Sequence, residues 1–123
     1  MTIKYRLYQI QPDSECPFLF MSMKWLQDKG YDAKYIWYDL ADSGTRAEKS
    51  ALKWSTQFIL ETLYSDYNPP RRGSNVNRPL RSMSVSDVVL LWIDGRVSAW
   101  YCDSVGFLRL NGLGWESVWD VAE

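Results

Sequence analysis

The order of hydrophobic and polar positions predicts a strand, a helix and a second strand in the first forty residues. From Ile3 to Ile10, apolar and polar side chains partly alternate, which is typical of a half-buried strand. Pro17 suits the first turn of a helix, and Gly30 lies where that helix would take its C-terminal cap. Tyr35 to Leu40 is short, aromatic and β-branched, so we predict a second strand there. Within the predicted helix, apolar residues recur at helical spacing at Leu19, Met23 and Leu26.

A start signal and an apolar stripe predict a second helix. Thr45-Arg46-Ala47-Glu48 has the pattern of a capping box, in which the threonine oxygen accepts the third N–H and the glutamate bonds back. The helix should end near Ser65-Asp66, because Asn68-Pro69-Pro70 cannot continue it. One face of this helix carries Leu52, Ser55, Ile59 and Thr62 or Leu63, with Trp54 and Phe58 beside them.

Two apolar runs joined by Asp94-Gly95 predict a β-hairpin, because both turn residues accept positive φ. A two-residue turn fixes the register, so each residue of Val88–Ile93 has one partner in Arg96–Cys102. One face is then apolar throughout and should pack on the helices: Trp92, Val97, Leu90, Ala99, Val88 and Tyr101. The other face is either covered by another element or presented to a partner: Ile93, Arg96, Leu91, Ser98, Val89 and Trp100.

These elements predict a single α+β domain over residues 1–123, an antiparallel sheet that includes the Asp-Gly hairpin, with two helices packed on one face. Residues 67–84 form a long loop with little periodicity between the second helix and the hairpin. Loops of this length inside a compact domain are often functional. This loop contains Arg71, Arg72, Arg78 and Arg81.

Composition argues against several classes of chemistry. Fourteen Lys and Arg against fifteen Asp and Glu give a net charge of −1, which argues against a domain whose whole surface binds DNA. The absence of histidine removes the commonest general base near neutral pH and the commonest metal ligand. Cys16 and Cys102 are too few for a disulfide scaffold or a Cys-only zinc site, and Cys102 suits a small buried strand residue better than a nucleophile. We therefore predict that the protein is not an enzyme and uses no cofactor or metal.

Localisation signals are not apparent in the sequence. Met1 to Arg6 has no apolar targeting segment, and the apolar stretch Cys16 to Met23 is shorter than the roughly 20 residues that span a bilayer. We expect a cytoplasmic protein with no membrane partner.

Aromatic residues are unusually frequent and indicate a binding surface. Seven Trp, eight Tyr and four Phe are hard to bury completely in a chain of 123 residues, so we expect several to be partly exposed. Trp115 and Trp119 are the best candidates, although a terminal turn folded back on the core would also explain them. We predict that the partner-binding residues are Arg71, Arg72, Arg78, Arg81, Trp100, Trp115 and Trp119, with a merely solvated loop as the alternative for the arginines.

Two motifs resemble the YodL-like domain family. They are Ser82-Met83-Ser84-Val85-Ser86-Asp87-Val88-Val89-Leu90 and Trp100-Tyr101-Cys102-Asp103-Ser104-Val105-Gly106-Phe107. Tyr5 to Ile10 and Leu60 to Asn68 are similar to the family's opening strand and its helix, whereas the loop from Pro69 to Leu80 is longer and richer in arginine. The resemblance implies a domain of phages, plasmids and conjugative elements of Gram-positive bacteria, and it implies no enzymatic activity.

The polar residues of these motifs have a structural and a chemical interpretation. Ser84, Ser86 and Asp87 can bond neighbouring backbone N–H groups where the hairpin begins, and Asp103-Ser104 with Gly106 can do the same where it ends. Alternatively, the hairpin register brings Asp87 and Asp103 close together, and two carboxylates with serine oxygens could hold a metal or act in acid–base chemistry.

We therefore expect a small non-enzymatic interaction protein of phage or mobile-element type, whose partner is a host protein or nucleoprotein. Inhibition of a bacterial defence system such as CRISPR would suit its size and lack of catalytic groups. A nucleic-acid-binding accessory protein that uses the arginine-rich loop is one alternative. A small-molecule or metal-binding domain with a site near the base of the hairpin is the other.

Overall fold

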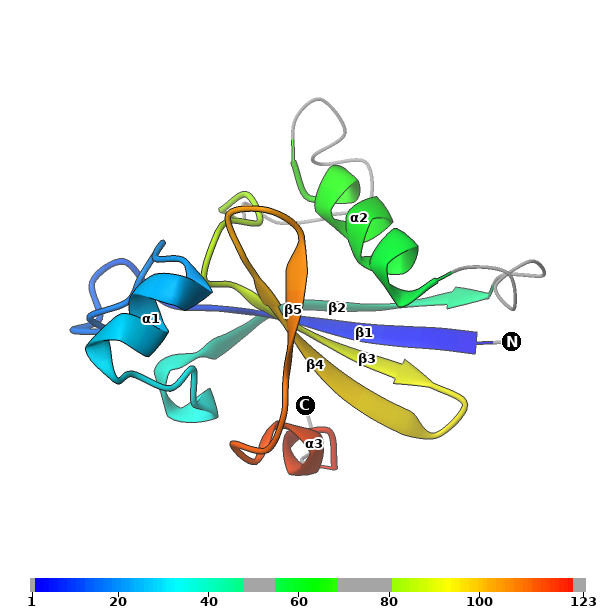
Figure 1. Ribbon diagram of the computed structural model, residues 1–123. Helices are drawn as coiled ribbons and strands as arrows, with labels where there is room; N and C mark the ends of the chain where they lie inside the picture. Colours follow the sequence, from blue (N-terminus) through cyan, green and yellow to red (C-terminus); the bar gives the residue numbers. More distant parts are fainter. Residues whose placement is uncertain (1, 48–54, 69–80, 121–123) are drawn as a thin grey trace.

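Five strands form one antiparallel sheet in the computed structural model, which describes residues 2–47, 55–68 and 81–120 (Figure 1). The strand order is β2-β1-β3-β4-β5, so β2 and β5 lie at the two edges. The predicted α+β class is confirmed. The strands are β1 (Thr2–Gln9), β2 (Asp39–Ala47), β3 (Val88–Ile93), β4 (Arg96–Cys102) and β5 (Phe107–Leu110). The helices are α1 (Met23–Lys29), α2 (Thr56–Asp66) and α3 (Trp115–Val118), with the short 3-10 helix η1 (Tyr35–Trp37).

The β3–β4 hairpin has the register that the sequence predicts. Val88 pairs with Tyr101 and Ile93 with Arg96, with no shift between them. Asp94 has φ 50° and Gly95 has φ 82°, the left-handed conformation that both central residues of a type I′ turn require.

Helices cover both faces of the sheet. On one face α2 packs against β1 and β3, and the buried side chains there include Ile59, Leu60, Leu63, Ile3, Leu7, Val89 and Leu91. On the opposite face the buried side chains include Leu26 of α1, Trp115 of α3, and Tyr8, Val88, Leu90 and Tyr101 of the sheet. Figure 1 shows α2 and α3 on opposite sides of the strands.

The prediction of two helices on one face is therefore wrong. All four residues from Val88 to Leu91 are buried, so β3 presents apolar side chains to both sides and each side needs its own cover. The hairpin face that carries Val89, Leu91 and Trp100 packs with α2, whereas the sequence had left open whether a partner covers it.

The second helix begins later than predicted. Thr45 lies in β2, where it pairs with Lys4 of β1, so the predicted capping box is wrong. Continuous antiparallel pairing of β2 with β1 outweighs the local capping preference of this segment. The N-cap of α2 is Ser55, whose Oγ accepts the N–H of Phe58 at 3.1 Å. The predicted end near Asp66 is confirmed.

Two boundaries before β2 also differ from the predictions. The chain from Tyr35 to Trp37 forms η1, and the strand begins at Asp39 instead of Tyr35. The first helix begins after its N-cap Ser22 and not at Pro17, because Phe20 has φ 65° and cannot continue a right-handed helix. The predicted C-terminal cap Gly30 is confirmed, with φ 79°.

Candidate functional site

Asp87 lies at the centre of a buried polar network at the open end of the hairpin. Its Oδ2 accepts the N–H of Ser84 at 2.8 Å and the side-chain amide of Gln9 at 3.0 Å. Its Oδ1 accepts Nη2 of Arg81 at 3.1 Å. Burial raises the pKa of the Asp87 carboxyl to about 6, although Arg81 and the hydrogen bonds act in the opposite direction. Both carboxylate oxygens are thus used inside the fold.

Ser86 and Asp103 hold the segment that precedes α1. The Ser86 Oγ accepts the N–H of Phe20 at 3.0 Å, and Asp103 Oδ1 accepts the N–H of Met23 at 3.0 Å. These partners lie far away in sequence and not next to the motif. The motif residues therefore attach the chain between Phe20 and Met23 to the base of the hairpin.

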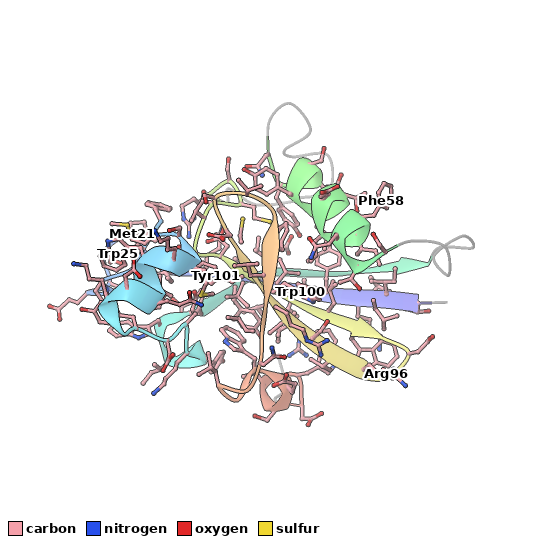
Figure 2. All side chains as sticks on the ribbon, viewed as in Figure 1. Met21, Trp25, Phe58, Arg96, Trp100 and Tyr101 are labelled. Atoms are coloured by element: carbon pink, nitrogen blue, oxygen red, sulfur yellow. The ribbon has the colours of Figure 1, made fainter. Side chains whose placement is uncertain are left out.

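Tyrosines reinforce this attachment. Tyr101 on β4 donates its hydroxyl to the carbonyl of Met21 at 2.6 Å, and Tyr38 donates to the carbonyl of Ser86 at 2.7 Å. Figure 2 shows Met21 and Trp25 at α1, at the end of the sheet opposite the β3–β4 turn that carries Arg96. The base of the hairpin and the region of α1 therefore form one connected unit.

Cys102 directly precedes Asp103, is buried on β4, and donates its backbone N–H to the carbonyl of Asp87 at 2.8 Å. Burial, with smaller effects from Asp87 and Asp103, raises the pKa of its thiol to about 12, so it stays a neutral thiol at pH 7. Asp87 bonds inward to Arg81, whereas Asp103 bonds to the backbone before α1. In the parts of the chain that the structure describes, no three His, Cys, Asp or Glu side chains lie close enough together to hold a metal ion.

A pocket of about 300 Å³ opens between α2 and the turn that joins β4 to β5. Two of its lining residues, Glu61 and Asp103, are carboxylates, and none is a lysine or arginine. The rings of Tyr64 and Phe107 contact each other edge to face with their centroids 6.5 Å apart. The lining residues are Glu61, Tyr64, Val85, Cys102, Asp103, Ser104, Gly106 and Phe107.

The segment after α1 carries the densest group of exposed large hydrophobic residues in the described chain. Ile36 at the centre of η1 is 83% exposed. Trp25 stacks on Tyr31 at an interplanar angle of 12°, and Tyr31 and Trp37 both contact the ring of Phe18. We call the following residues the aromatic surface: Trp25, Tyr31, Tyr35, Ile36 and Trp37.

The predicted partner-binding tryptophans lie elsewhere, and none is freely exposed. Trp115 is fully buried and donates its indole N–H to the carbonyl of Ala33 at 2.7 Å, so its expected exposure is wrong. Trp119 is half-buried, with the guanidinium of Arg6 4.1 Å above its ring. Trp100 is half-buried against the core on the α2 face and donates to Ser98 Oγ.

Of the predicted arginines, Arg81 is the one inside the described residues. Its guanidinium bonds Asp87 and the carbonyl of Ile10, and it lies 5.1 Å from the ring centre of Phe20. Its side chain is 22% exposed, which leaves little of it for a partner. Arg71, Arg72 and Arg78 lie outside the described residues, as does most of the predicted loop 67–84.

The sequence analysis did not predict the aromatic surface, because part of it was assigned to a strand. Tyr35-Ile36-Trp37-Tyr38 has four large apolar residues in a row, where a half-buried strand would alternate with polar ones. In the structure Tyr38 alone of these four is buried, and the other three project from a 3-10 turn. The lack of alternation between apolar and polar residues was the signal that could have indicated an exposed surface here.

The fold and its motif residues define an α+β domain with a five-stranded antiparallel sheet covered on both faces, in which the polar motif residues join the hairpin to the α1 region. The family model of the YodL-like domain matches residues 4–112, so the chain belongs to the YodL-like domain family. A search of curated proteins and a search of solved structures each find no match. In the described ranges, no helix has the length and apolar character needed to cross a membrane.

Proposed function

We propose that this protein is a non-enzymatic binding module that engages another protein through the aromatic surface. The observation that carries this proposal is the exposure of Tyr31, Tyr35, Ile36 and Trp37 within seven residues of one segment, where Ile36 alone is 83% exposed. Exposed clusters of aromatic residues are typical of protein interfaces, where Trp and Tyr supply most of the binding energy. The bonds from Tyr38 to the carbonyl of Ser86 and from Trp115 to the carbonyl of Ala33 attach this segment to the core.

Charge favours a protein over a nucleic acid as the partner. Between Phe20 and Leu40, three lysines are balanced by three aspartates, so this region has no net positive charge. Binding to nucleic acid depends on neutralising phosphates with Lys and Arg, which this region cannot do in excess. The proposal that Arg71, Arg72 and Arg78 bind nucleic acid remains separate, because it concerns residues outside the described part of the chain.

We further propose that the bound protein belongs to the host of a phage or other mobile element, in the cytoplasm, and that binding inhibits a defence system of that host. The support is the family resemblance together with the small size of the domain. Its test is the protection of a phage from a defence system when this protein is expressed in the host, and loss of that protection in the variant described next.

A matched pair of variants tests the interface. Ile36→Asp places a negative charge at the centre of the aromatic surface, whereas Arg96→Asp places one at the exposed β3–β4 turn, at the end of the sheet opposite α1 (Figure 2). A partner captured from bacterial lysate is purified, and its affinity for each variant is measured by calorimetry. We expect Ile36→Asp to weaken binding at least tenfold, about 1.4 kcal/mol, and Arg96→Asp to leave it within twofold.

Unchanged affinity of Ile36→Asp for the partner would contradict the proposal. Binding of single-stranded DNA or RNA that falls steeply with salt and is lost in Ile36→Asp would also contradict it, and would favour the nucleic-acid alternative. Thermal unfolding of both variants confirms that each is folded.

A further inference from the structure

The pocket between α2 and the β4–β5 turn combines negative charge with apolar walls. Glu61 projects from α2 and is exposed, and Asp103 is half-buried on the opposite wall. No ion pair joins either carboxylate to a described residue, and Asp103 uses one oxygen to accept the N–H of Met23. Among the residues that the structure describes, no lysine or arginine lines the pocket or pairs with these two carboxylates.

Apolar side chains lie beside the two carboxylates in the lining and at the rim of this pocket. Tyr64, which is 43% exposed, and Phe107 provide two rings in edge contact, and Val85 adds an aliphatic wall. Val105, between two lining residues, is 87% exposed. An aromatic face attracts an organic cation, and an aliphatic stem gains from contact with the same walls.

The composition of the pocket favours an organic cation over a metal ion. Ca²⁺ takes roughly six to eight oxygen ligands, and the two carboxylates, one of which already accepts the N–H of Met23, supply only a small part of such a set among the described residues. A guanidinium or ammonium group on an apolar stem matches both parts of the pocket, because its charge faces the carboxylates while its methylene groups contact the rings.

We propose that this pocket binds the side chain of an arginine or lysine of the partner protein. The proposal rests on the proposed function, since it takes the partner to be a protein. The head of the side chain lies between Glu61 and Asp103, and its stem lies against Tyr64 and Phe107. The pocket thus adds a charge-specific contact, on the α2 face of the sheet, to the contact made by the aromatic surface on the other face.

A small probe tests the pocket without any partner. The backbone amide signals of Ser104, Gly106 and Phe107 are followed by NMR during titration with N-acetyl-arginine methylamide. N-acetyl-citrulline methylamide, of the same shape but neutral, is the matched probe. We expect saturable shifts with a millimolar dissociation constant for the arginine probe and at least fivefold weaker binding of the citrulline probe, because Glu61 is solvent-exposed and its charge is partly screened.

Variants separate this pocket from general charge effects. Glu61→Gln removes an exposed carboxylate whose side chain makes no ion pair or hydrogen bond with a described residue, and we expect it to weaken binding of the arginine probe about fivefold. Glu116→Gln on α3 removes an exposed carboxylate elsewhere and should leave binding unchanged. Equal binding of both probes, or no effect of Glu61→Gln, would overturn the proposal.

A third arm distinguishes the source of the cation. Propylguanidine carries the same guanidinium and methylene stem, with the same charge, but without the peptide groups. Binding of propylguanidine more than tenfold tighter than the blocked arginine would assign the pocket to a small free cation and overturn the partner assignment. These titrations contain no partner protein, so they do not depend on whether the aromatic surface binds one. The proposal for the pocket and the proposal for the aromatic surface can therefore be refuted independently.

Discussion

At the scale of single residues, the polar side chains of the two motifs form hydrogen bonds and an ion pair inside the fold. Asp87 uses both carboxylate oxygens on Gln9, Arg81 and Ser84, and its side chain has no exposed surface. Buried charge is tolerated when it is paired and hydrogen-bonded, and removal of one partner leaves the other uncompensated. The burial and bonding of Asp87 are thus explained by the stability of the hairpin base.

Titration of Asp87 should lower stability as the pH rises. Its pKa is about 6 in the folded state against an ordinary value of 3.8 for an aspartate, so the folded protein binds the proton more tightly. Between pH 4 and pH 6 the folded state holds more protons, and the free energy of unfolding should fall by up to about 3 kcal/mol from this group, with no further change above pH 7.

The measurement is the difference in unfolding free energy between the protein and Asp87→Asn, followed from pH 4 to pH 7 by chemical denaturation. Asp87→Asn removes the titration and replaces one acceptor oxygen with an NH2 donor, a change that does not depend on pH, and other carboxylates cancel in the difference. A carboxyl carbon signal of Asp87 with its midpoint below pH 4 would refute the expected direction.

At the scale of elements, close packing between β1 and β2 requires a glycine at position 44. Gly44 pairs with Tyr5 across the two strands, and a Cβ built at Gly44 would overlap the buried ring of Tyr5. That ring packs edge to face against Tyr67 at 6.3 Å, and Tyr67 donates to Asp42 at 2.7 Å. The ring therefore has no free space into which to move.

Gly44→Ala should destabilise the fold by about 2 kcal/mol through overpacking. The neighbouring Ser43→Ala, on the same strand but with its side chain on the other side, should change stability by less than about 0.5 kcal/mol. Urea denaturation of both variants provides the comparison. Equal stability of the two would show that the ring of Tyr5 yields to the added methyl group.

Elements fixed by local chemistry were predictable, and elements decided by distant contacts were not. Asp94-Gly95 sets the hairpin register within two residues, so the sequence predicted every pair. Thr45 has the local pattern of a helix start, yet pairing with Lys4, forty-one positions away, places it in a strand. The same reason explains Trp115, whose burial depends on a bond to Ala33 across 82 positions.

At the scale of the whole molecule, the sheet is buried on both faces. The residues available to a partner therefore lie in the helices and connecting segments around the sheet. The aromatic surface belongs to the α1–η1 region, whereas the acidic pocket lies between α2 and the β4–β5 turn. Composition predicted an aromatic surface, but its position depends on which rings the fold leaves uncovered. The buried network around Asp87 joins the hairpin to the segment before α1 and holds these parts together.

The most direct test of the account is amide hydrogen exchange of the protein alone and in complex with its purified partner. We predict that the partner slows exchange most strongly in the segment from Tyr31 to Leu40, because the partner covers the aromatic surface there. Slowed exchange confined to other elements, with this segment unchanged, would contradict the claim that the exposed rings of η1 are the binding surface.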